Sequence, residues 1–223
     1  MSKQVEKCYM CDEDGITVEH VPPKCLFPEK KDSIGGVDLK KQLITVPACH
    51  EHNTKKSNDD VYFQFVITAN ILTNIHAEQQ VKTKIKRAID RTSHVYQHFI
   101  ANNVIAKIDD LDREEFNTIA FKIDNDRLFS SIDHIAYGIY YHEYGQTFTG
   151  TIDIAFEGLL NDDVPDLIER TSRLIFNLES LLSGIEWKGE NPEIFQYKID
   201  QLGSSTYLLM KFYESLRITA VMH

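Results

Sequence analysis

Two short runs near the start of the chain carry pairs of side chains that bind soft metal ions. The first is the C-x-x-C sequence Cys8-Tyr9-Met10-Cys11, and the second is the C-x-x-H sequence Cys49-His50-Glu51-His52. Each short loop aims two thiolate or imidazole ligands at one point, and two such loops make the tetrahedral set that zinc prefers. The sequence therefore predicts one structural zinc ion, whose ligands are Cys8, Cys11, Cys49 and His52.

A zinc ion with four protein ligands has no open position for a substrate, so its predicted role is structural. Residues 1–60 hold few large apolar side chains, and a metal supplies the folding free energy that such a segment cannot obtain by burial. Two alternatives stay open at this point. Either Cys25 or His50 replaces one of the four ligands, or the cysteines are reduced and partly buried beside surface histidines.

Three segments between residues 8 and 63 carry a family resemblance, namely CYMC, EHVPPKCLFP and LITVPACHEHNTKKSNDDVYF. They resemble the HNH endonucleases in the C-x-x-C sequence, in the Glu-His pair followed by proline, and in the asparagine directly after the second ligand pair. The resemblance implies a zinc-bound ββα-metal module over residues 1–60 that hydrolyses DNA phosphodiester bonds. A weaker similarity to uncharacterised members extends to Tyr137–Glu143 and to the FQY of the tail.

The resemblance also implies a role for each residue of the site. His20 matches the general base, which takes a proton from the attacking water, and a histidine suits this task because its pKa lies near neutrality. Glu19 and Asn53 match the residues that hold a catalytic divalent ion, Mg²⁺ or Mn²⁺. Such an ion polarises the scissile phosphate and offsets charge on the leaving oxygen. RNA is an alternative substrate, since this chemistry does not read the 2′-hydroxyl.

The chain departs from the family pattern at two places. His52 stands where the fourth zinc ligand is usually Cys, and the stretch Ile44–Ala48 lacks the asparagine that many members carry before the third zinc ligand. The group that would orient His20 is therefore unidentified. The alternative function is a catalytically inactive, zinc-stapled module that binds nucleic acid or a protein.

The charge of the chain excludes a protein that coats nucleic acid through bulk charge. It has 24 Lys and Arg against 34 Asp and Glu, a formal net charge of −10. Local cations still fit contact with a phosphate backbone, and the alternative for each is a solvated helix face. The candidate contacts are Lys55 and Lys56 after Asn53, and Lys82, Lys84, Lys86, Arg87 and Arg91 in a predicted helix.

The hydrophobic content of 42% over 223 residues is sufficient for a folded core. All four cysteines precede residue 60, which predicts a boundary there: the HNH-like module that the resemblance implies over 1–60, and an α+β domain of unknown role over 61–223. The expected helices begin near 57–60, 80, 127 and 164, and alternating apolar residues predict strands over 195–199, 207–212 and 216–221. The fold class is therefore α+β, led by the small metal module.

No apolar run is long enough to span a membrane, and the first residues lack a signal-peptide stretch, which favours a cytoplasmic protein. In a reducing compartment, four cysteines favour metal binding over disulfides. The resemblance fits a bacterial defence setting. The C-terminal domain is the expected place for a second copy of the chain or a protein partner, and its residues do not choose between them.

Overall fold

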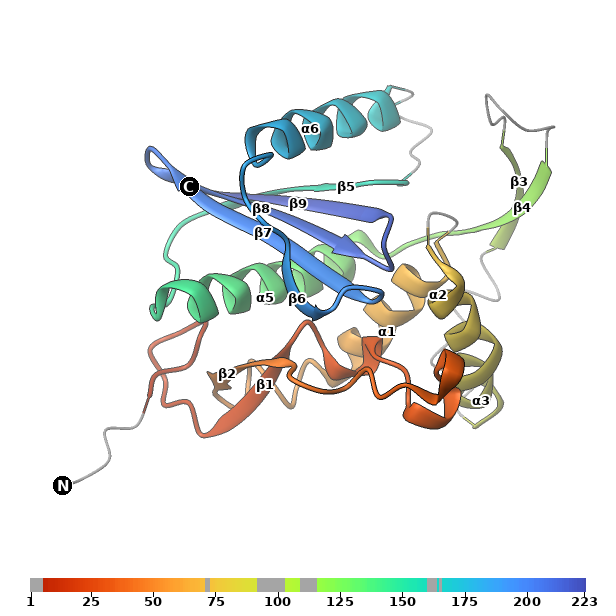
Figure 1. The fold of residues 1–223 in the computed structure, drawn as a ribbon, viewed down its shortest axis with the longest axis horizontal. Coiled ribbons are helices and arrows are strands. Elements are labelled where there is room, and N and C mark those ends of the chain that lie inside the picture. The colour runs from red at the N-terminus through yellow and green to blue at the C-terminus, as the bar shows by residue number, and fades with distance from the viewer. Residues whose placement is uncertain (1–5, 71–72, 92–102, 109–115, 160–163, 165) are drawn as a thin grey trace.

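The computed structural model describes residues 6–70, 73–91, 103–108, 116–159, 164 and 166–223. Its main body is layered, as Figure 1 shows from top to bottom. The layers are helix α6 (Leu167–Leu181), a five-stranded sheet, helix α5 (Asn125–Tyr144), and a hairpin of β1 (Thr17–Val21) with β2 (Ile44–Ala48). This mixture of helices and antiparallel sheets confirms the α+β class.

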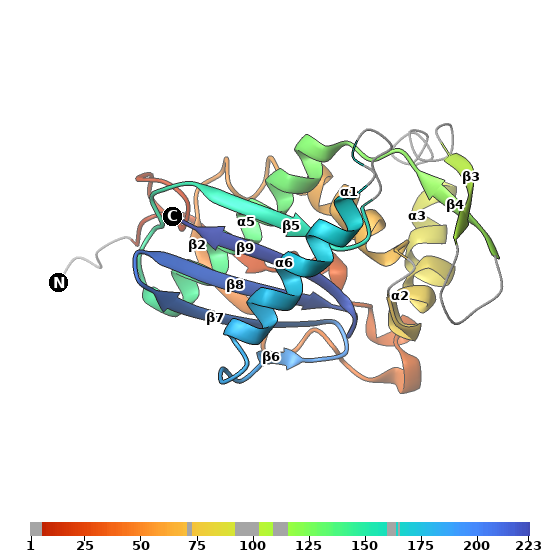
Figure 2. The same ribbon diagram turned by 90° about the horizontal axis from the view of Figure 1, so that it is seen from above.

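The five-stranded sheet is antiparallel throughout, with the order β5-β9-β8-β7-β6 (Figure 2). Its strands are β5 (Ile152–Phe156), β6 (Lys188–Asn191), β7 (Phe195–Leu202), β8 (Ser205–Phe212) and β9 (Leu216–Met222). The three alternating segments of the tail are therefore strands, as predicted. A separate hairpin joins β3 (Asn103–Ile108) to β4 (Phe116–Phe121).

The helices between the hairpin and the sheet follow one another closely. They are α1 (Ser57–Thr68), α2 (Ile75–Gln80), the π-helical turn η4 (Val81–Ile85) and α3 (Lys86–Arg91). The helix expected from about 80 to 102 starts earlier, because the Asn74 side chain caps α2 by accepting from the backbone N–H groups of His76 and Ala77. Its predicted end lies outside the described residues. None of the described helices combines the length and apolar character needed to cross a bilayer.

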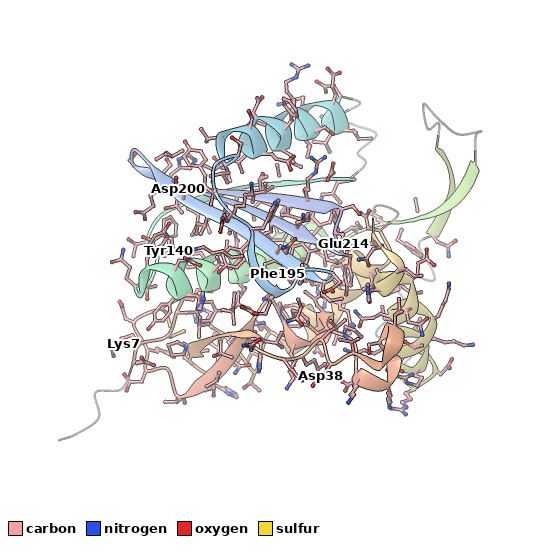
Figure 3. The ribbon with its side chains drawn as sticks, viewed as in Figure 1. Lys7, Asp38, Tyr140, Phe195, Asp200 and Glu214 are labelled. Atoms are coloured by element: carbon pink, nitrogen blue, oxygen red, sulfur yellow. The ribbon has the colours of Figure 1, made fainter. Side chains whose placement is uncertain are left out.

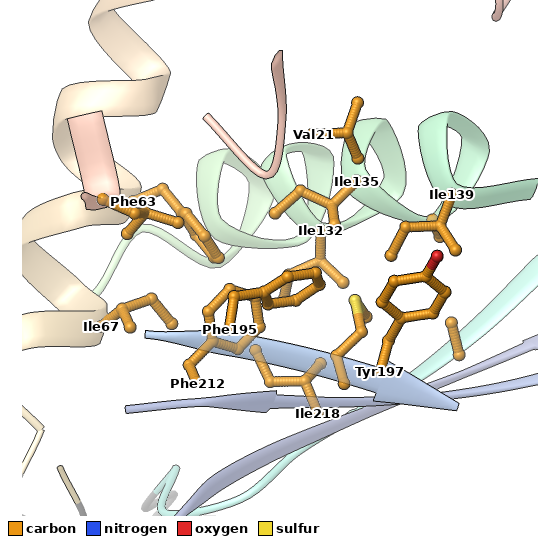
Figure 4. Packing of buried hydrophobic residues seen from close by; sticks show 14 of the residues in the cluster. Val21, Phe63, Ile67, Ile132, Ile135, Ile139, Phe195, Tyr197, Phe212 and Ile218 are labelled. Carbon is orange, nitrogen blue, oxygen red and sulfur yellow. The ribbon is translucent and has the colours of Figure 1, made fainter. Parts of the chain in front are cut away.

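Helix α5 connects the sheet to the N-terminal hairpin. Asp124 caps its start and Gly145 ends it in a left-handed conformation. Ile132, Ile135 and Ile139 recur at helical spacing and pack toward the sheet (Figure 4). On another side of the helix, a Cβ at Gly138 would lie 2.5 Å from Val21 of β1, so glycine permits this close approach.

One buried cluster runs through both predicted domains. It includes Cys8, Val21 and Cys49 from the N-terminal segment together with Phe195 and Phe212 from the sheet. The segment over 1–60 therefore shares its core with the remainder of the chain.

A buried polar group fastens α2 to two distant segments. The Gln80 side chain is fully buried, and its Nε2 donates to the Leu26 carbonyl at 2.5 Å and the Tyr213 hydroxyl at 2.6 Å. Its Oε1 accepts from Gln64 at 3.2 Å. These bonds satisfy groups that water cannot reach.

We expect Gln80→Ala to lower the free energy of unfolding by about 2–4 kcal/mol, because it leaves buried partners unpaired and opens a cavity. Urea unfolding followed by circular dichroism measures the loss. Glu78→Ala is the control, since Glu78 is exposed on the same helix. An equal effect of both substitutions would contradict the importance of the buried bonds.

Candidate metal centre and the strand beside it

Two hydrogen-bonded loops position the predicted zinc ligands. In the first loop, Cys8 donates its N–H to the Glu13 carbonyl, and the N–H of Tyr9 bonds the carbonyl of Pro47 in β2, both at 2.8 Å. The second loop follows β2 directly. There the Tyr9 hydroxyl donates to the backbone carbonyl of His52 at 3.3 Å. The hairpin thus brings two ligand pairs together that are far apart in sequence.

The distances between the four ligand atoms match a tetrahedral site. Cys11 Sγ lies 3.8 Å from Cys49 Sγ, and His52 Nδ1 lies 3.5 Å from Cys8 Sγ and 3.3 Å from Cys49 Sγ. Zinc bonds of about 2.3 Å to sulfur and 2.0 Å to nitrogen give tetrahedral edges of about 3.8 Å and 3.5 Å. All four ligand atoms lie within 4.8 Å of one another. The set is therefore compatible with a structural metal such as zinc.

The same residues form the one group of three or more His, Cys, Asp or Glu side chains placed to share a metal ion in the described part of the chain. Cys25 lies outside it, and its thiol donates instead to the Asp60 carbonyl at 3.3 Å. Burial, followed by the sulfurs of Cys8 and Cys49, raises the pKa of the Cys11 thiol to about 11. A bound cation would reverse this effect, because metals bind the thiolate.

Two contacts attach the metal centre to the C-terminal part of the chain. The ring of His134 on α5 packs against the ring of His52, with centroids 5.9 Å apart, and His134 Nδ1 lies 2.7 Å from the Ser130 carbonyl. The hydroxyl of Thr147 donates to the Cys8 carbonyl at 3.1 Å. Sequence reasoning did not identify this supporting shell, since no short-range pattern links residues that far apart.

Glu19 lies on the buried face of β1, where its side chain contacts a lysine. Lys56 Nζ lies 2.7 Å from Glu19 Oε1 and 2.5 Å from Asp60 Oδ1, and Glu19 is only 6% exposed. Burial raises the pKa of Glu19 to about 7, even though the positive charge of Lys56 acts in the opposite direction. The carboxylate predicted to hold a catalytic ion therefore has an ammonium group as its partner.

His20 follows Glu19 in a strand whose side chains alternate between two faces. Glu19 and Val21 are buried, whereas Val18 is 61% exposed and His20 is half-buried. Burial, and then the charge of Lys24, lowers the pKa of the His20 imidazole. Within the described residues, no hydrogen bond or ion pair involves this ring. His20 is therefore accessible and predominantly neutral at neutral pH, and it faces away from the Glu19 carboxylate.

Asn53 connects the second metal loop to the open edge of β1. Its Nδ2 donates to Thr17 Oγ1 at 3.0 Å and to the Val18 carbonyl at 3.1 Å. Its Oδ1 takes part in no hydrogen bond within the part of the chain that the structure describes. Asn53 thus comes next to the strand that carries Glu19 and His20, and its amide oxygen is available to a ligand.

The cations predicted to contact nucleic acid have different environments. Lys55 pairs with Glu51, Lys82 with Glu78, and Arg87 with Asp32, whereas Lys86 is exposed. Lys56 is instead only 8% exposed between its two carboxylates, so its ammonium does not face solvent. From the sequence, the contact of Lys56 with Asp60 could be expected from their i, i+4 spacing, whereas the contact of Lys56 with Glu19 could not.

Together, the fold and the ligand set define an α+β protein with a Cys3His cluster, compatible with a structural metal, beside an N-terminal β-hairpin. Comparisons with protein-family models, with curated proteins and with solved structures give no match.

Proposed function

We propose that this protein is a metal-dependent endonuclease of the HNH type that hydrolyses phosphodiester bonds in DNA. The observation that carries the proposal is the placement of Asn53. It follows the candidate metal ligand His52 directly, and its amide bonds Thr17 and Val18 of β1, the strand that carries His20, while its Oδ1 has no hydrogen bond among the described residues. A structural metal that fixes His52 would also fix Asn53 against the strand that carries the base.

Each residue has a distinct task in this proposal. His20 takes a proton from the attacking water, and its lowered pKa keeps the imidazole in the neutral form that this step needs. Asn53 and Glu19 offer the hard oxygen ligands that Mg²⁺ or Mn²⁺ prefers. When bound, that ion would stabilise charge on the phosphate. Glu19 joins it only by exchanging the Lys56 ammonium, whose contact with Asp60 can persist.

A second function is supported by the same ion pair. Because Lys56 already neutralises Glu19, the hairpin is also suited to a binding module without catalysis, in which the structural metal holds the shape and the surface binds nucleic acid or a protein. The site does not distinguish DNA from RNA by any feature of its chemistry, so RNA remains a substrate to be tested.

The test is cleavage of supercoiled plasmid and of single-stranded RNA with Mg²⁺, Mn²⁺ or EDTA, alongside zinc quantification. We expect cleavage with either added ion and none with EDTA. Asn53→Ala should lower the rate by about tenfold or more, because it removes one ligand and the support of β1. Thr54→Ala is the matched control, as Thr54 is exposed and directly follows Asn53. If the folded, zinc-loaded protein cuts neither substrate, the nuclease proposal is wrong and the function as a binding module is favoured.

A further inference from the structure

A basic groove lies between the segment that follows β1 and helix α3. Its volume is about 450 Å³, and its lining includes Glu29 and Lys31 from one side and Lys84, Arg87 and Arg91 from the other. Figures 1 and 2 both place the turns after β1 beside α3. In Figure 3, Lys7 marks the metal-centre end of the N-terminal segment, and Asp38 lies toward the groove end.

The groove carries positive charge that the acidic side chains of the described residues neutralise only in part. Glu29 is already paired with Lys40, and Asp32, just outside the lining, binds Arg87 through both carboxylate oxygens at 3.0 and 2.5 Å. The remaining cations, Lys31, Lys84 and Arg91, have no carboxylate within ion-pair distance among the described residues. Because the chain as a whole has a net charge of −10, this cluster of cations indicates a binding site for an anion.

Lys84 is the most informative of these cations. Its side chain is half-buried, and its Nζ donates to the Cys25 carbonyl at 2.6 Å. An ammonium has three N–H donors, so two remain for a further acceptor. Burial lowers the pKa of Lys84, which means that its charge is poorly solvated. A bound anion would restore the interaction that burial removes.

The spacing of the cations suits a run of phosphates better than a single one. Lys84, Arg87 and Arg91 recur at i, i+3 and i+7, which places them on one face of the helix over about 10 Å. One nucleic-acid strand carries a phosphate about every 3.4 Å along its axis. A nucleic-acid strand can contact these side chains in turn, whereas a single phosphate ion would require all of them to converge on one point.

The groove is also connected to β1, the strand that carries the proposed base His20. Lys84 bonds the turn η1 (Lys24–Leu26), which follows β1 after two prolines. In the same turn, the charge of Lys24 is near enough to lower the pKa of His20. The positive charge of Lys24 therefore lies near His20 and in the turn that Lys84 contacts.

We propose that this groove binds the phosphate backbone of a nucleic acid on one side of the bond that is cut, through Lys31, Lys84 and Arg91. This inference rests on the proposed function for the kind of ligand, and it adds where that ligand lies. It also assigns Lys82 and Lys86 to the solvent-exposed surface outside the groove.

The test is binding of a fluorescein-labelled DNA duplex, followed by anisotropy without added Mg²⁺ or Mn²⁺ so that no cleavage occurs. The groove variant is Lys31→Glu with Arg91→Glu, and the matched control is Lys82→Glu with Lys86→Glu. Both change the net charge equally, and all four side chains are exposed. We expect the groove variant to bind about tenfold or more weakly, with a salt slope smaller by about 2, and the control to bind nearly as the wild type.

Equal losses of affinity in the two variants, or no loss in either, would overturn the proposal that the groove binds nucleic acid. A parallel arm measures inorganic phosphate by calorimetry, and binding of phosphate without binding of the duplex would overturn the nucleic-acid assignment. Since no catalytic ion is added, the result is independent of cleavage. If binding depends on the groove but the protein cuts no substrate, only the nuclease proposal is wrong. If the protein cuts DNA but the groove variant binds the duplex as the wild type does, only the groove proposal is wrong.

Discussion

Cys49→Ser is expected to remove the structural metal and to unfold the protein at temperatures where the wild-type chain is folded. Cys49 is 2% exposed, and its Sγ lies 3.3 Å from His52 Nδ1 and 3.8 Å from Cys11 Sγ. A serine hydroxyl is a much poorer zinc ligand than a thiolate. Structural zinc contributes about 10–16 kcal/mol of apparent binding free energy, whereas a whole domain is stable by about 5–15 kcal/mol. The loss of most of the zinc-binding free energy therefore exceeds the stability of a whole domain.

The expected measurements are a zinc content that falls from about one ion per chain to near zero, by elemental analysis, and a lost or strongly lowered thermal transition by circular dichroism. The transition should be affected throughout the chain, because Cys8 and Cys49 belong to the same buried cluster as Phe212 of the sheet. If Cys49→Ser affects only part of the thermal transition, the N-terminal segment folds separately from the sheet.

Cys25→Ser is the matched control for this experiment. The Cys25 thiol donates to the Asp60 carbonyl at 3.3 Å, and a serine hydroxyl can make the same bond. We expect full zinc content and a small change in stability. Full zinc in Cys49→Ser, or loss of zinc in Cys25→Ser, would refute the ligand set, and a different metal in the wild-type protein would refute the choice of zinc.

The parts of the structure that were predictable from sequence depend on residues close together in the chain. Two ligands separated by two residues almost fix their own geometry, so the pairs at Cys8 and Cys49 could be found without a fold. The tail could be predicted as strands because alternation along β7, β8 and β9 reflects one buried face.

The partners of the candidate site were not predictable, because they depend on contacts across the fold. Adjacent residues in a strand face opposite sides, so Glu19 and His20 have different neighbours once β1 pairs with β2. The contact of Glu19 with Lys56 requires the start of α1 to lie under that strand. The groove likewise requires Lys31 and Lys84, which belong to separate elements, to meet in space.

His20→Ala is expected to keep the fold and the structural metal while lowering Mg²⁺- or Mn²⁺-dependent cleavage by about 10²–10⁴-fold, the usual contribution of a general base. The side chain is half-buried on the outer face of β1 and makes no hydrogen bond within the described residues, so removing it disturbs few contacts. Initial rates of plasmid nicking measure the effect, together with zinc content and the midpoint of thermal unfolding.

Val18→Ala is the matched control, because Val18 lies on the same face of β1 and is 61% exposed. Its carbonyl, which accepts from Asn53, stays in place in this variant. The two variants separate chemistry from structure: a base is needed at position 20, whereas any small side chain serves at position 18. If His20→Ala nicks DNA at the wild-type rate, His20 is not the base. Equal slowing of both variants, with lowered unfolding midpoints, would instead mean that β1 matters to the reaction only as a support for Asn53.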